Sequence, residues 1–283
     1  MSHPVIVGVD DAANTGAAVD WAADEADLRG ARLHLVHAWQ WEDEGPDSLD
    51  AALIQGSGEQ TLDTLVRRAR ERHTDLQITS GAVEVAPREA LTALSAEAQL
   101  LVVGSRGLGG FPGLLTGSTS LYVAAHAACP VVVVPGSGSE ATGGVTVGLH
   151  ARQAHDEVLS FAFEAAQRRQ IPLRVVHTWS YPLIRMSGRV APPVYEAGQV
   201  EAEQARLVAE VLAGWSGKYP GVPVEEDVVR SGPAKRLVAL SGTAQLMVVG
   251  RHGTPDGPTG RLGSVSQAVV QHAQCPVAVV PVG

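Results

Sequence analysis

Two sets of glycines and hydroxyl residues with one shared spacing are the best candidates for chemistry in this sequence. Each set has the pattern G-x2-G-x9-G-S and directly follows a short apolar run. The members are Gly104, Gly107, Gly117 and Ser118 in the first set, and Gly250, Gly253, Gly263 and Ser264 in the second. A glycine at the end of a strand lets the backbone approach a ligand without a Cβ. The pattern therefore favours a ligand held close to the main chain.

The residues after the last glycine of each set predict the start of a helix. They are Ser118, Thr119 and Ser120 in the first set, and Ser264, Val265 and Ser266 in the second. Unpaired N–H groups and a partial positive charge at a helix N-terminus suit a phosphate. The hydroxyls of Ser118 and Ser120 could add direct hydrogen bonds. The alternative is that the glycines form only turns and the serines only cap helices.

The sequence contains an internal repeat. The segment Val7-Gly8-Val9-Asp10 aligns with Val147-Gly148-Leu149-His150, and Val36-His37-Ala38-Trp39 aligns with Val176-His177-Thr178-Trp179. A register kept over so many positions indicates a tandem duplication. A stretch rich in glycine and serine divides the copies, which is typical of a flexible linker. We predict domains at 1–136 and 144–283, joined by a linker at 137–143.

The elements that must position these residues alternate along each half. The apolar runs that predict strands are Val5–Val9, Leu33–Ala38, Leu100–Val103 and Val131–Val134, with matching runs in the second half. Patterns with helical period lie between them, including Thr61–Arg72. Strands that are apolar on both faces predict a parallel sheet covered by helices on both sides. We therefore expect two tandem doubly wound α/β domains, each with a five-stranded parallel sheet.

Composition narrows the function classes. The chain has 283 residues, 45% of them hydrophobic, and a formal net charge of −9. A negative chain lacks the cationic excess that drives bulk nucleic-acid binding, so we expect no nucleic-acid partner. We see no signal peptide and no apolar run long enough to span a membrane, so we expect a cytoplasmic protein.

Weaker candidates have structural interpretations. Cys129 and Cys275 each precede a proline, and burial in the core is the expected role of such a thiol. His126 and Cys129 have the spacing of metal ligands, but two ligands do not complete a tetrahedral zinc site. We therefore predict no metal bound by protein ligands alone. The longer region from Tyr181 to about residue 200 predicts a loop or a lid over the binding face.

The sequence resembles tandem universal stress proteins over almost its whole length. The segments that carry the resemblance are 7–10, 36–39, 102–107, 117–120 and 129–135. The spacing of the glycines is that of the ATP-binding branch of that family. The resemblance implies the strand order 3-2-1-4-5 in each domain, with ATP lying across the ends of strands one and four and Mg²⁺ as its companion.

The resemblance also implies roles for individual residues. Asp10 would hold the ribose or the edge of adenine, and the backbone at Ala38 would read adenine. The residues implied to surround the nucleotide are Val9, Val103, Gly104, Arg106, Gly107, Gly117, Ser118, Thr119 and Ser120. Their counterparts in the second half are Leu149, His150, Thr178, Val249, Gly250, Gly253, Gly263, Ser264, Val265 and Ser266. No catalytic residue is implied.

The second half departs from the pattern at His150, which replaces the carboxylate of Asp10. A lost charged hydrogen bond weakens binding by about ten- to a hundredfold. We therefore expect the first half to bind ATP better than the second.

The functional prediction is an ATP-dependent stress-response regulator with little or no hydrolysis. A slow ATPase and a nucleotide-independent scaffold or chaperone-like dimer are the alternatives. In the family the last strand pairs domains. Here that implies an internal pseudo-dimer of the two halves or a pairing of two chains.

Overall fold

The computed structural model describes residues 3–10, 15–40, 49–105, 116–136, 141–181, 184–186, 189–191, 198–253 and 260–283. Two of the residues predicted to bind the nucleotide, Arg106 and Gly107, lie outside these ranges, and so do residues 137–140 of the predicted linker.

The first half alternates strands and helices in the predicted way. Its elements are β1 (Val5–Val9), α1 (Thr15–Leu28), β2 (Leu33–Trp39), α2 (Leu49–Arg72), β3 (Ile78–Glu84), α3 (Pro87–Leu94), β4 (Leu100–Gly104), α4 (Ser118–His126) and β5 (Val131–Val134).

The second half repeats this order and adds a two-stranded hairpin. Its elements are β6 (Val145–Leu149), α5 (Asp156–Arg169), β7 (Leu173–Trp179), β8 (Ile184–Met186), β9 (Arg189–Ala191), α6 (Gln199–Lys218), β10 (Val224–Arg230), α7 (Pro233–Leu240), β11 (Leu246–Arg251), α8 (Ser264–His272) and β12 (Val277–Pro281). The hairpin β8–β9 lies in the region predicted as a loop or lid. Its role as a lid stays a prediction.

The prediction of two separate five-stranded sheets is corrected by the structure. All the main strands form one ten-stranded sheet with the order β10-β7-β6-β11-β12-β5-β4-β1-β2-β3. Within each half the strands still follow the doubly wound order 3-2-1-4-5, and all pairs inside a half are parallel.

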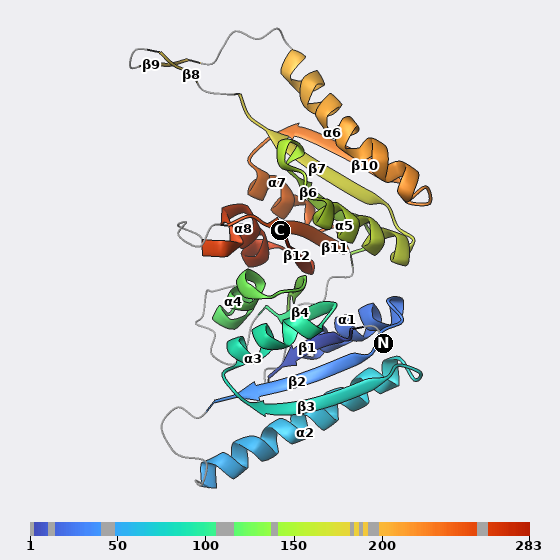
Figure 1. Cartoon of the computed structure of the whole chain (residues 1–283), viewed down its shortest axis with the longest axis vertical. Helices are drawn as coiled ribbons and strands as arrows, with labels where there is room; N and C mark the ends of the chain where they lie inside the picture. Colours follow the sequence, from blue (N-terminus) through green and yellow to red (C-terminus); the bar gives the residue numbers. More distant parts are fainter. Residues whose placement is uncertain are drawn as a thin grey trace.

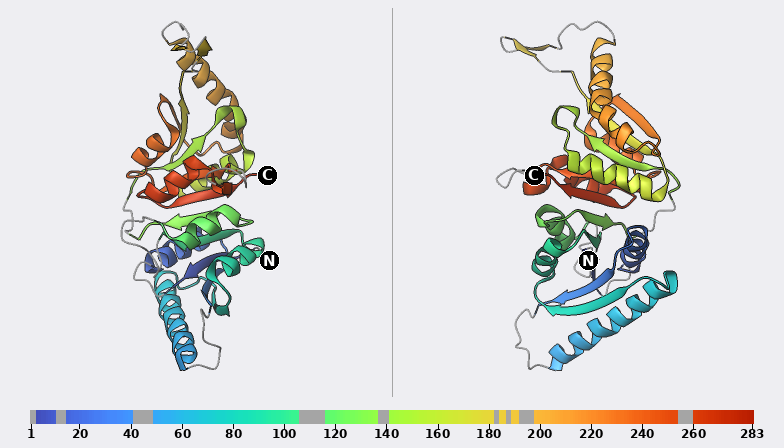
Figure 2. Two further views of the ribbon diagram at one scale, coloured as in Figure 1. Left: turned by 90° about the vertical axis from the view of Figure 1, so that its left-hand side faces the viewer. Right: turned by 45° about the vertical axis from the view of Figure 1, so that its right-hand side comes forward.

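The two halves meet at the last strand of each. β5 and β12 pair antiparallel, with Val131 opposite Val279 and Val133 opposite Val277. Figure 2 shows these strands side by side at the centre, with one half on either side. The internal pairing implied by the resemblance is therefore present. Both strands have a neighbour on each side, so neither offers a free edge to a second chain.

Helices cover both faces of the sheet, as Figure 1 shows. The helices α1, α2, α5 and α6 pack on one face, and α3, α4, α7 and α8 pack on the other. The strands β1, β4 and β5 are almost wholly buried because their valines and leucines contact helices on both sides. This double burial explains why the strands are apolar at nearly every position.

Helix α2 is longer than predicted, because it begins at Leu49 instead of near Thr61. Gly58 lies inside it and would weaken a helix on local propensity alone. The structure gives a reason for this glycine. A Cβ built at Gly58 would lie 2.7 Å from Nδ1 of His37, so the helix and the histidine can approach only because no side chain intervenes.

Candidate functional site

The candidate site lies where the winding of the sheet reverses. From β1 the chain continues outward to β2 and β3, whereas β4 lies on the opposite side of β1 and leads to β5. β1 and β4 are parallel neighbours, with Val5 opposite Leu100 and Val7 opposite Val102. Ligands of doubly wound sheets bind beyond the carboxyl ends of strands at such a reversal. The predicted residues at the ends of β1 and β4 are therefore brought together.

A buried serine fixes helix α4 over the end of β4. The Ser120 hydroxyl donates a hydrogen bond of 2.6 Å to the carbonyl oxygen of Gly104, which is the last residue of the strand. Ser266 makes the same bond of 2.6 Å to the Gly250 carbonyl in the second half. Both serines are buried. These hydroxyls therefore position the helices on the strands. Ser120, which the sequence suggested as a direct ligand of the phosphate, has its hydroxyl bonded to the strand instead.

The first turn of α4 has the character of an anion site. Its N-cap residue, Gly117, has no side chain to cap the helix, and no acidic residue lies in the first turn. The Gly117 N–H donates to the Ser105 carbonyl at 2.6 Å, which ties the helix start to the residue after β4. Ser118 is exposed and Thr119 is half-buried. The first-turn amides thus carry a positive dipole end that no side chain of the turn neutralises.

Asp10 follows β1 and faces the start of the next helix. The Thr15 hydroxyl, on the first residue of α1, donates a hydrogen bond to Oδ1 of Asp10. This bond orients the carboxylate at the end of β1, beside β4. Ala38 is half-buried near the end of β2, and Val9 and Val103 are buried beneath the site.

The second-half site has a different shape at the equivalent positions. A Cβ built at Gly250 would lie 2.6 Å from Cε1 of His252, because the imidazole ring lies directly against this glycine. Gly263 has φ +79°, whereas Gly117 has φ −70°. The Gly253 N–H donates to the Arg261 carbonyl at 2.9 Å. The same spacing of glycines therefore accompanies two different local structures.

The other predicted residues of the second half lie around the ends of its strands. Leu149 and Val249 are buried, Thr178 and Val265 are half-buried, and His150 and Ser264 are exposed. The sequence interpretation missed His155 and His252. Both stand at repeat positions of first-half residues, Thr15 and Arg106, so the duplication itself carried the signal.

His37 and His177, near the end of the second strand of each half, are structural residues. His177 is buried, with one ring nitrogen 3.1 Å from the Leu149 carbonyl and the other 3.0 Å from Oε1 of Gln204. His37 is equally buried and lies against Gly58.

The cysteines are core residues, as predicted. Cys129 and Cys275 are free and buried, and burial raises the pKa of each thiol to about 12. Such thiols stay protonated and unreactive near neutral pH. Across the described ranges, no three His, Cys, Asp or Glu side chains are grouped in a way that could hold a metal ion. No helix in those ranges is both long and apolar enough to cross a membrane.

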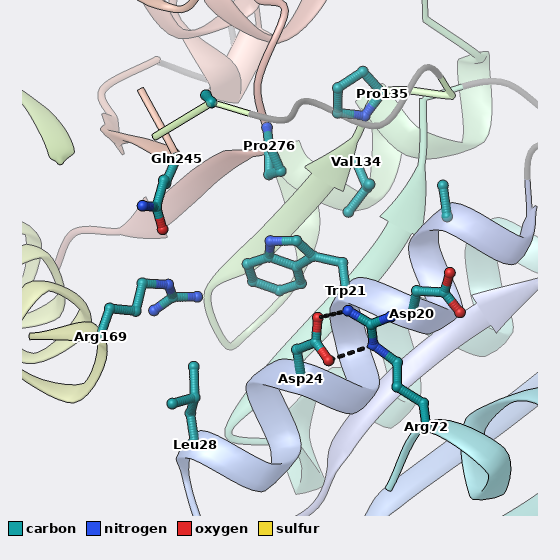
Figure 3. A pocket seen from close by; sticks show the side chains of 12 residues that line it. Asp20, Trp21, Asp24, Leu28, Arg72, Val134, Pro135, Arg169, Gln245 and Pro276 are labelled. Carbon is teal, nitrogen blue, oxygen red and sulfur yellow. Dashed lines mark hydrogen bonds and ion pairs between the residues drawn. The ribbon is translucent and has the colours of Figure 1, made fainter. Parts of the chain in front are cut away.

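A cavity of about 410 Å³ lies between the halves, and the residues that line it (Figure 3) include none of those predicted to bind the nucleotide. Trp21 and Asp24 of α1 line it, together with Arg169 from the end of α5. Asp24 is paired with Arg72 at 2.5 Å, and the Arg169 guanidinium lies 5.8 Å from the centre of the Trp21 ring. These charges already have protein partners, so the cavity belongs to the junction of the halves.

Comparison with known proteins addresses the fold and the family. The model of the universal stress protein family matches residues 1–135 and 145–281. A universal stress protein of Mycobacterium tuberculosis (strain H37Rv) is 36% identical over 299 residues, covering 97% of this chain and 95% of that protein. One from Mycolicibacterium smegmatis is 35% identical over 295 residues, covering 98% of this chain and 97% of that protein.

A solved structure shows the same fold. The crystal structure of a universal stress protein from Archaeoglobus fulgidus superposes with a TM-score of 0.70 at 19% identity, covering 99% of this chain and 98% of that chain. The family match in both halves and the relatives aligned over almost the full length lead to one conclusion: this chain belongs to the universal stress protein family, with two such domains in tandem.

Proposed function

We propose that the first half binds ATP at the ends of β1 and β4, and that the chain acts as a nucleotide-dependent stress-response regulator. The observation that carries this proposal is the helix α4, held over the end of β4 by the bond between Ser120 and Gly104. No side chain of the N-cap residue Gly117 caps the helix, and its first turn contains no acidic residue. Such a helix start is suited to the phosphates of a nucleotide.

Asp10 supplies the second part of the proposed site. Its carboxylate lies at the end of β1 and is oriented by Thr15. A carboxylate can accept hydrogen bonds from ribose hydroxyls or from the amino group of adenine. The α4 first turn offers no carboxylate to a metal ion. Mg²⁺ would therefore be held mainly by phosphate oxygens and water, and it would neutralise part of the charge of the triphosphate.

We propose a binding role with slow hydrolysis or none. The recognised parts of the site bind and orient, through backbone amides, a fixed hydroxyl and one carboxylate. We expect phosphate release slower than about one per second. Sustained release above that rate would favour the enzyme alternative.

Calorimetry with ATP and Mg²⁺ on the full chain tests the site. Asp10→Ala should weaken binding by about ten- to a hundredfold, because it removes a charged hydrogen-bond acceptor. Asp20→Ala is the matched control, since Asp20 lies on α1 and its carboxylate pairs with Arg68 at 2.6 Å. Equal affinity of wild type and Asp10→Ala would contradict the assignment of Asp10.

Gly117→Val tests the phosphate end of the site. The backbone at Gly117 has φ −70°, which valine adopts readily, so the protein should fold while the new side chain obstructs the phosphates. We expect ATP binding in the first half to be lost. Unchanged binding in this variant, with native circular dichroism, would show that the ligand lies elsewhere. A wild type that does not bind ATP would favour the scaffold alternative.

A further inference from the structure

Three imidazoles gather at the strand ends of the second half. His150 follows β6, His155 precedes α5 and His252 follows β11. In the register of the duplication they replace Asp10, Thr15 and Arg106. The second half thus has three imidazoles, a side-chain type that can switch between a neutral and a charged form, where the first half has an acid, a hydroxyl and a permanent cation.

Two members of this histidine cluster are in direct contact, and the charge of the third, His150, acts on His252. The rings of His155 and His252 meet edge to face, with centroids 4.5 Å apart and planes at 66°. The His252 ring lies against Gly250 near the end of β11, although His252 as a residue is exposed. The pKa of His252 is lowered, first by burial of the ring and then by the neighbouring charges of His155 and His150, while a hydrogen bond to the Gly250 backbone opposes the shift. The lowered pKa favours the neutral form of the His252 ring that lies against Gly250.

Other charged groups on the surrounding elements frame the cluster. Asp156 and Glu157 lie in the first turn of α5, directly after His155, and carry negative charge. Three arginines on neighbouring elements carry positive charge, and two of them have partners of their own. Arg152 pairs with Glu203 at 3.6 Å, Arg251 donates to the Ala127 carbonyl at 2.7 Å, and Arg261 precedes α8.

A protonated cluster would face a second positive group. The first turn of α8 contains no acidic residue, and its N-cap, Gly263, makes no side-chain cap. Ser266 holds this helix start to Gly250, which is the residue that His252 covers. Protonated imidazoles and the helix N-terminus would repel one another unless an anion lay between them.

We propose that the second half contains a proton-gated site for phosphate-bearing anions, which the His252 ring closes at neutral pH. Protonation of the histidine cluster turns these side chains from a cover into ligands of the anion, next to the first turn of α8. The proposal rests on the proposed function only because it treats the second site as the counterpart of the nucleotide site in the first half.

The direction of the coupling follows from charge. A histidine whose pKa is lowered in the folded protein holds fewer protons than in the unfolded chain, so stability is lost as the pH falls through the unfolded value of about 6.5. A bound anion favours the protonated form. Anion binding should therefore take up protons and restore the stability that acid removes.

Histidine NMR on the full chain, with inorganic tripolyphosphate as the probe, tests the proposal at each ring. Single His→Gln variants assign the signals of His150, His155 and His252. At about pH 5.8 the probe should shift these signals and raise their titration midpoints by about one pH unit. At about pH 7.5 the same concentration should leave them unchanged. Signals that the probe leaves unchanged at about pH 5.8, with titration midpoints that it does not move, would overturn the proposal.

Two substitutions at His252 distinguish the steric effect of its ring from the effect of its positive charge. His252→Gln keeps a polar side chain but cannot gain a proton, so acid-dependent binding should weaken by at least about tenfold. His252→Gly removes the cover, so the probe should bind near neutral pH through the α8 amides. His34→Gln is the control, because burial also lowers the pKa of His34 but this residue is on β2 in the first half. Equal effects of His252→Gln and His34→Gln would count against the site.

The outcomes distinguish this inference from the proposed function. Loss of the tripolyphosphate response with normal ATP binding in the first half defeats the inference alone. Failure of ATP to bind the first half, while the histidine signals still respond to tripolyphosphate, defeats the proposed function alone.

Discussion

At the scale of the residue, Gly117 and Gly263 show that one motif can have two different backbone conformations. They hold the same place in the repeat and each precedes a helix, but their φ angles are −70° and +79°. At Gly263 a Cβ would also lie 3.3 Å from the Gly253 nitrogen. Glycine is required there by the backbone itself, whereas at Gly117 the backbone would accept any residue. The spacing of the motif singles out both glycines, but it does not show that only Gly263 is required by its backbone conformation.

This difference predicts unequal costs for the same substitution. Gly263→Ala should lower the free energy of unfolding by about 1–3 kcal/mol, because alanine is strained at that φ. Gly117→Ala should change it by less than about 1 kcal/mol in nucleotide-free protein. Urea unfolding of the two variants provides the measurement. Equal losses would mean that the backbone at Gly263 relaxes freely.

At the scale of the element, the placement of α4 depends on a single hydroxyl. The sequence predicts a helix near Ser118 because small polar residues follow a glycine, and the structure begins α4 there. The role of Ser120 is less visible, because an i, i+2 pair of serines does not reveal which one turns inward. Its bond to Gly104 appears only once the helix lies on the strand.

Ser120→Ala should therefore cost stability and ATP affinity together. The half-buried Gly104 carbonyl would lose the hydrogen bond from Ser120, which costs about 1–3 kcal/mol of the free energy of unfolding. Ser118→Ala is the matched control, since Ser118 is exposed on the same turn and should leave stability unchanged. Thermal unfolding and calorimetry with ATP measure both effects. A larger loss of stability in Ser118→Ala would contradict the positioning role of Ser120.

Other elements show where sequence patterns stop being informative. The strands β5 and β12 are predicted closely, because runs of valine bounded by proline have few alternatives. The start of α2 is not predicted, since Gly58 weakens the helical pattern and its contact with His37 comes from a distant part of the chain.

At the scale of the whole molecule, a buried carboxylate joins the halves. Glu25 of α1 is 1% exposed and pairs with Arg29 at 2.5 Å and with Arg169 from the other half. Burial lowers the pKa of Arg29, and the charge of Glu25 opposes this shift. The continuous sheet could not be predicted from the sequence, because apolar last strands can pair equally well within one chain or between two chains. The ion pair between the halves depends on that pairing and could not be predicted either.

Removing the Glu25 carboxylate should lower the free energy of unfolding more than removing the Arg169 guanidinium. Glu25→Gln leaves two guanidiniums buried together and should cost about 3–5 kcal/mol of the free energy of unfolding. Arg169→Met should cost less, because Glu25 keeps its bond to Arg29 and the methionine still packs on Trp21. Differential scanning calorimetry should show the greater fall in Tm for Glu25→Gln. The reverse order would mean that Arg169 carries the junction.

The buried carboxylate of Glu25 also favours some pairings of the halves over others. Arg29 and Arg169 are equivalent residues of the duplication, but the counterpart of Glu25 is Ala165. Two copies of the first half would bring two acids and two bases together, a neutral arrangement. Two copies of the second half would bring together two arginines without a counterpart of Glu25 between them. Fusion in one chain supplies Arg169 with the carboxylate that a pair of second halves would lack.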